Sequence, residues 1–130
     1  MTIILDDYAI PQQGAFEIHT VVQINVSADQ AQRLARRFLI NEVSHLLVTA
    51  VPDLVVGEQT RWRVPVWIGF PGGGRHTVGV IEVDAQTGAF VDQAAQVAEI
   101  SARAAGAADS LPPFAARTDA PATSRTKDLP

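Results

Sequence analysis

The stretch from Arg61 to Gly88, RWRVPVWIGFPGGGRHTVGVIEVDAQTG, decides the fold of this chain. Its first part alternates regularly, and alternate side chains of a strand point to opposite faces. One face carries Trp62, Val64, Val66, Ile68 and Phe70, and the other carries Arg61, Arg63, Pro65, Trp67 and Gly69. A second run, HTVGVIEV, follows the glycines and also has the composition of a strand. The stretch therefore predicts two paired strands of one sheet.

The glycines between these strands could form either a ligand-binding loop or the bend of a hairpin. A phosphate-binding loop needs a Lys-Ser or Lys-Thr pair followed by a helix. The text PGGGRH, at residues 71–76, lacks the lysine and leads into a strand. Glycine readily adopts the positive φ values that a hairpin bend requires. We therefore predict a bend, on which Arg75 and His76 remain candidates for contact with an anion.

The flanking regions predict further strands and two helices. Residues 15–26 alternate and predict a strand, and residues 54–57 predict a shorter one. Ser27 and the glutamine three residues later form a capping-box pattern, which begins an amphipathic helix predicted over Ser27–Val48. Residues 93–108 are rich in alanine and predict a second helix.

These elements predict an α+β fold. We expect an antiparallel sheet of four or five strands, one long amphipathic helix packed on one face, and a second, Ala-rich helix. Residues 1–105 are expected to form this single domain. Residues 106–130, which are rich in proline and lack periodicity, are expected to form a flexible tail that folding does not require. The residues expected in the core are Phe16, Ile24, Leu34, Phe38, Trp62 and Val64.

The composition suits a protein that folds around an apolar core. Of the 130 residues, 47% are hydrophobic and 18% are charged, and there is no cysteine to form a disulfide or a thiolate metal site. The N-terminus lacks the basic start and long apolar run of a secretory signal, and no run approaches the length of a membrane span. We expect a cytoplasmic protein with no membrane association.

The charge of the chain argues against general affinity for nucleic acid. Its formal net charge is −4 at neutral pH. Arg33, Arg36 and Arg37 nevertheless form a small basic cluster on the first predicted helix. This cluster is either a solvated helix face or a contact for an acidic partner.

No catalytic, metal-binding or cofactor-binding pattern stands out. The histidines, His19, His45 and His76, do not have the spacing of a metal site with a carboxylate. Ser44 precedes His45, but neighbours on a helix point about 100° apart, and the chain has no Gly-x-Ser-x-Gly elbow. We expect a non-enzymatic protein without a cofactor.

Trp62 and Trp67 are five residues apart and should point to opposite faces of the sheet. One is expected beneath the first helix, and the other stands with Pro65 on the second face, which we expect Val21 to share. Burying a large apolar side chain contributes about 1.5–3 kcal/mol, so we expect a cover for that face. The candidates are the second helix, a second copy of the chain or another protein. A homodimer through the Trp67 face needs only one self-complementary patch.

The region from Ser27 to about Val91 resembles the PepSY-like domains. The resemblance lies in a helix, a strand with the pattern Trp-x-Val at Trp62 and Val64, and a closing strand that ends in Val-Asp-x-x-Thr-Gly at residues 83–88. It implies a helix packed on an antiparallel sheet and a role in peptidase inhibition, regulation or protein binding. Such domains lie mostly outside the cytoplasm, and the family supplies no catalytic residues.

We therefore expect a small interaction or regulatory module that self-associates through a sheet face. The residues expected at the interface are Trp67, Pro65, Val21, Arg61, Arg63, Arg75 and His76. Two alternatives stay open. One is a toxin-neutralising, antitoxin-like partner whose tail folds on its target, suggested by small size, acidity and the C-terminal segment. The other is a protein that binds an anion or small molecule with the arginines and His76 around the glycine loop.

Overall fold

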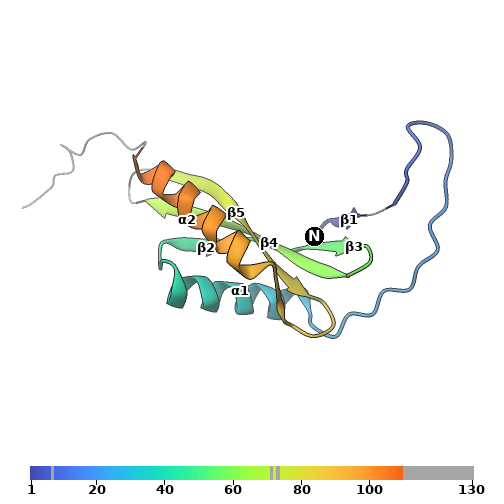
Figure 1. The fold of residues 1–130 in the computed structure, drawn as a ribbon, viewed down its shortest axis with the longest axis horizontal. Helices are drawn as coiled ribbons and strands as arrows, with labels where there is room; N and C mark the ends of the chain where they lie inside the picture. Colours follow the sequence, from blue (N-terminus) through green and yellow to red (C-terminus); the bar gives the residue numbers. More distant parts are fainter. Residues whose placement is uncertain (7, 71, 73, 110–130) are drawn as a thin grey trace, which may run out of the picture.

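The computed structural model describes residues 1–6, 8–70, 72 and 74–109. These residues form one mixed sheet and two helices (Figure 1). The elements in chain order are β1 (Ile3–Leu5), α1 (Ala28–Glu42), β2 (Leu47–Thr49), β3 (Asp53–Val56), β4 (Arg61–Phe70), β5 (Gly74–Asp84), β6 (Phe90–Val91) and α2 (Gln93–Asp109).

The sheet is built around the β4–β5 hairpin. The strand order is β1-β3-β4-β5-β6, and β2 pairs with β4 beyond the end of β3. Phe70 pairs with Gly74, so the glycine segment is the bend of a hairpin, as predicted. The α+β class is confirmed, and the sheet is mostly antiparallel. It has six strands rather than four or five, because β1 pairs with β3 in parallel and β2 adds a short strand.

The first helix begins where predicted and ends earlier. The Ser27 hydroxyl accepts a hydrogen bond from the backbone N–H of Gln30, and the Gln30 side chain accepts one from the N–H of Ser27. The predicted end at Val48 is wrong, since α1 ends at Glu42 and residues 47–49 pair with β4. The Ser44 hydroxyl accepts from the N–H of Leu46, a local bond that competes with helix continuation.

The strand predicted over residues 15–26 does not form. Figure 1 shows this segment looping away from the sheet before it enters α1. Phe16 is 49% exposed and Ile24 is 44% exposed, so placing them in the core was wrong. Alternation indicates that a segment can form a strand, but not whether a sheet edge is free to pair with it. Here β1 pairs with the edge of β3.

The core lies between the helices and one face of the sheet. Along β4 the burial alternates, with Trp62, Val64, Val66 and Ile68 buried and the residues between them half-buried. Trp62 and Val64 are in the core as expected. Leu34 and Phe38 are partly buried against it, and the Phe38 and Phe90 rings lie 5.1 Å apart.

The second helix packs into the same core. Its buried residue, Ile100, belongs to one cluster with Ala31, Ala35 and Leu39 of α1 and with the apolar side chains around Trp62. α1 therefore packs on the face that carries Trp62, whereas α2 lies beside β5, where Ile100 enters the core and Gln96 hydrogen-bonds Glu82 on the other face. Most contacts of α2 with the sheet are with β5.

Gly79 of β5 allows α2 to approach the sheet closely. Its φ is +151°, and a Cβ built there would lie 2.9 Å from Cγ1 of Ile100. Any larger residue would meet both an unfavourable backbone conformation and a clash.

The predicted start of the tail, residue 106, is too early, because α2 continues to Asp109. The remainder of the predicted tail, residues 110–130, lies outside the described residues. Neither described helix is long and apolar enough to cross a membrane.

Candidate functional site

The sheet face opposite α1 is the main candidate for a functional surface. We call it the open face. Paired residues on neighbouring antiparallel strands share a face, which identifies its members on β4, β5 and β2. The pairs are Arg61 with Asp84, Arg63 with Glu82, Pro65 with Val80, Trp67 with Thr77, and Trp67 with Val48.

One half of the open face is apolar. Trp67 and Val80 are half-buried, yet neither packs against the core cluster, and Val48 beside Trp67 is 45% exposed. The guanidinium carbon of Arg75 lies 4.4 Å from the centroid of the Trp67 ring, within the range of a cation–π contact. We call this half the Trp67 patch and define it as Val48, Pro65, Trp67, Thr77 and Val80. Its apolar residues lie outside the core cluster to which both described helices contribute.

The other half of the open face is an ion-pair network. The carboxylate of Glu82, whose side chain is 9% exposed, receives Nε of Arg61 at 3.2 Å and Nε of Arg63 at 2.9 Å. A second nitrogen of Arg61 lies 3.0 Å from Asp6. The side-chain amide of Gln96 on α2 also donates to Glu82 at 3.3 Å. This network ties β1, β4, β5 and α2 together.

Burial lowers the pKa of Arg61, but its hydrogen bond to Asp6 and the charge of Glu82 outweigh burial and leave this pKa raised. Arg61 therefore stays charged, and both arginines of the network are already neutralised by carboxylates. Neither is available as an unpaired cation for an anionic ligand.

The predicted anion site comprises Arg61, Arg63, Arg75 and His76. These four side chains do not come together. Arg75 pairs with Gly69 near the hairpin bend, eight residues along β4 from Arg61. At about 3.3 Å per residue, this separation is roughly 26 Å. His76 pairs with Ile68 and so belongs to the other face, where its ring lies 5.9 Å from that of Phe70. The buried Nε2 of His76 has no hydrogen-bond partner among the described residues.

Of the residues expected at the interface, the structure brings together Pro65, Trp67 and Arg75. Val21 is 97% exposed and lies on the irregular segment, where it borders the turn between β3 and β4 rather than the Trp67 patch. Val48 was not expected in this patch, because the predicted first helix includes it. Val80 was not expected there either, although it lies two residues before Glu82 and a strand places such residues on the same face.

The Val-Asp-x-x-Thr-Gly segment forms the turn after β5. Oδ1 of Asp84 accepts hydrogen bonds from the backbone N–H groups of Gln86 and Thr87, and Gly88 adopts φ +80°. The Gln59 side chain donates to the other oxygen at 2.7 Å, and this bond, with those from the turn, holds the pKa of Asp84 below its usual value. The role of Asp84 in this geometry is to hold the turn.

No described group of three or more His, Asp or Glu side chains is arranged to hold a metal ion. No family model matches the chain, and neither a curated protein nor a solved structure matches it.

Proposed function

We propose that this chain is a non-enzymatic interaction module that self-associates through the Trp67 patch. The proposal rests on one observation: the buried side chains of both helices belong to the core cluster around Trp62, and the apolar residues of the Trp67 patch lie outside that cluster. Tryptophan is enriched at the centres of protein interfaces, where it contributes much of the binding energy.

A second copy is the partner that the charges favour. The described open face carries nearly balanced charges. Its positive residues are Arg61, Arg63 and Arg75, and its negative residues are Asp6, Asp53, Glu82 and Asp84. Two copies stacked face to face would therefore avoid strong like-charge repulsion. A two-fold arrangement would also let each Trp67 pack on the apolar patch of its mate.

The PepSY-like resemblance belongs to this proposal. It is supported by a helix on a mostly antiparallel sheet and by the turn at Asp84, both of which are structural features. On this view the module regulates or binds a protein and catalyses nothing. A cytoplasmic location is part of the same proposal, and the absence of cysteine is compatible with a reducing compartment.

Sedimentation velocity tests the proposal. Wild type should sediment as a dimer over a concentration series, and Trp67→Glu should sediment as a folded monomer. Val21→Glu is the matched control, because it adds the same charge at a residue that is 97% exposed and away from the patch. A monomeric wild type, or a Val21→Glu variant that dissociates as readily as Trp67→Glu, contradicts the proposal.

A cysteine cross-link locates the interface independently. The chain has no cysteine, so Thr77→Cys introduces a single thiol opposite Trp67 on the open face. Oxidation should yield a disulfide-linked dimer. Gln86→Cys, on the exposed turn after β5, should stay mostly monomeric under the same conditions. Equal cross-linking of the two variants would show random collision and not a defined interface.

A further inference from the structure

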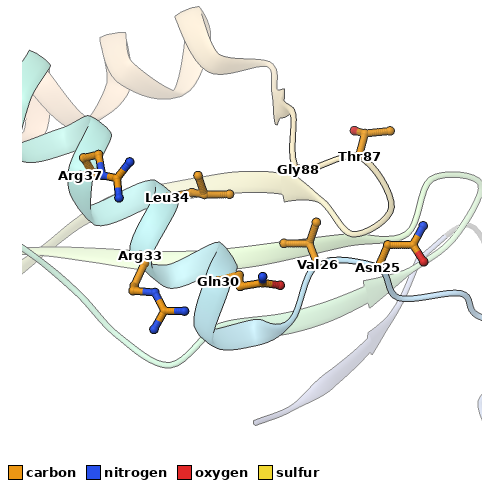
Figure 2. Close-up of a pocket in the computed structure, with 8 residues that line it drawn as sticks. All are labelled: Asn25, Val26, Gln30, Arg33, Leu34, Arg37, Thr87 and Gly88. Atoms are coloured by element: carbon orange, nitrogen blue, oxygen red, sulfur yellow. The ribbon is translucent and has the colours of Figure 1, made fainter.

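A second candidate site lies outside the open face, between α1 and the turn after β5. It is an open pocket of about 380 Å³, within the size range of small-ligand sites. Figure 2 shows its lining side chains arising from α1, from the segment before it and from the turn. They are Asn25, Val26, Gln30, Arg33, Leu34, Arg37, Thr87 and Gly88.

The polar groups of this pocket are mostly hydrogen-bond donors. Oε1 of Gln30 accepts the backbone N–H of Ser27 in the capping box, so the Nε2 end of this amide remains as a donor. Oδ1 of Asn25 likewise accepts from Gln23, which leaves its Nδ2 as a donor. No Asp or Glu lines the pocket. Such a lining suits a ligand that supplies acceptors.

The positive charge of the pocket is incompletely neutralised. Arg33 pairs with Asp29 at 2.6 Å on the helix surface, whereas Arg37, one turn later, has no ion pair or hydrogen bond among the described residues. Like charges four residues apart on a helix destabilise it slightly. An anion bound beside Arg37 would relieve that repulsion.

The floor of the pocket is apolar. Val26 and Leu34 are half-buried and pack against the core, and a Cβ at Gly88 would lie 3.5 Å from Val26 and 3.9 Å from Leu34. Gly88 thus leaves room beside these two side chains. A ligand that fills the space would contact hydrocarbon on one side and donors on the other.

From this combination we propose that the pocket binds a carboxylate carried next to a small apolar group. The carboxylate accepts hydrogen bonds from Arg37 and from Nε2 of Gln30, and the apolar group lies on Val26 and Leu34. Such a ligand can be a free amphipathic acid or the C-terminal carboxylate of a peptide that ends in an apolar residue. The proposal does not depend on self-association through the Trp67 patch.

Backbone amide NMR shifts with simple probes test the site on the full chain. Hexanoate represents the free acid, N-acetylleucine represents a peptide terminus, and acetate carries the charge alone. At millimolar concentrations, hexanoate or N-acetylleucine should cause saturable shifts centred on Asn25, Val26, Thr87 and Gly88. The tighter of the two identifies the source. Acetate should bind at least several-fold more weakly.

Two variants and a control make the test specific. Gln30→Glu keeps the capping box, because glutamate accepts from Ser27 equally well, but it replaces the donor with a negative charge. It should abolish the shifts without lowering the melting temperature. Arg37→Gln should weaken binding about tenfold, as expected for one charge-assisted hydrogen bond. Arg36→Gln removes a neighbouring exposed arginine that does not line this pocket and should change affinity little.

The proposal is overturned if neither amphipathic probe causes saturable shifts. It is also overturned if acetate binds as well as hexanoate, since the apolar floor would then contribute nothing. Equal binding by wild type and Gln30→Glu would place the carboxylate elsewhere.

Discussion

The two faces of β4 differ in what covers them, although the same ten residues contribute to both. On one face, Trp62 is 3% exposed, packs in the core cluster, and donates its Nε1 hydrogen to the carbonyl of Val26 at 2.6 Å. On the other, Trp67 is partly exposed and contacts Arg75. One tryptophan therefore stabilises the fold, while the other lies outside the core cluster and is the one that we propose for self-association.

The largest expected effect comes from truncating each tryptophan in turn. Trp62→Ala should lower the free energy of unfolding by about 3–5 kcal/mol, because it leaves a cavity and an unpaired carbonyl. Trp67→Ala should cost the isolated chain about 1 kcal/mol or less, mainly through the cation–π contact. Urea unfolding at a concentration where the chain is monomeric measures both. Equal losses would mean that the two faces are equally buried.

The sequence predicted the local features of β4 and α1. Period-two alternation placed Trp62 and Trp67 on opposite faces, and the capping-box pattern located the start of α1. Both signals are local, since each depends on residues a few positions apart. The α+β class followed from them.

The features that the sequence did not predict depend on contacts between distant segments. The alternation of residues 15–26 was not accompanied by pairing with a sheet edge. Leu47 fits the helical spacing equally well, but it pairs with Ile68 in the sheet. The pocket beside Arg37 likewise combines α1 with a turn about fifty residues away. The sequence identifies the arginines of this pocket as a basic cluster, but it does not predict that an apolar floor lies beside them.

A substitution at Gly79 tests how closely α2 packs against β5. Gly79→Ala should lower the free energy of unfolding by about 2–4 kcal/mol, since it combines an unfavourable φ with a clash against Ile100. Gly69→Ala on β4 is the matched control, because a Cβ there meets no atom within 4 Å. It should change stability far less. If the clash matters, combining Gly79→Ala with Ile100→Ala, which removes Cγ1, should cost less than the sum of the two single losses, whereas strictly additive losses would assign the effect to the backbone alone.

The ion-pair half of the open face should show a smaller effect. Glu82→Gln should cost about 1–2 kcal/mol, because the amide keeps one acceptor but no longer neutralises Arg61 and Arg63. Asp29→Asn breaks the exposed pair with Arg33 and should cost no more than about 0.5 kcal/mol. Thermal unfolding compares the two variants. Equal losses would mean that Glu82 is as well solvated as Asp29.

The smallest expected effect is a pH dependence from Asp84, which ends β5 opposite Arg61. Hydrogen bonds from Gln59 and then from the turn lower the pKa of Asp84 in the folded chain relative to 3.8. The folded state therefore binds this proton less readily than the unfolded state. Its contribution to stability is full above the unfolded pKa and is lost as pH falls through the folded one.

Urea unfolding of wild type and Asp84→Asn from neutral to acidic pH measures this contribution. The stability difference between them should stay constant near neutrality and shrink below about pH 4, where the wild-type carboxyl becomes neutral like the amide. Gln59→Leu removes the side-chain donor but leaves the backbone N–H bonds of Gln86 and Thr87 in place, so it should weaken the pH dependence without removing it. A difference that persists unchanged into strong acid would show that Asp84 stabilises the turn through its shape rather than its charge.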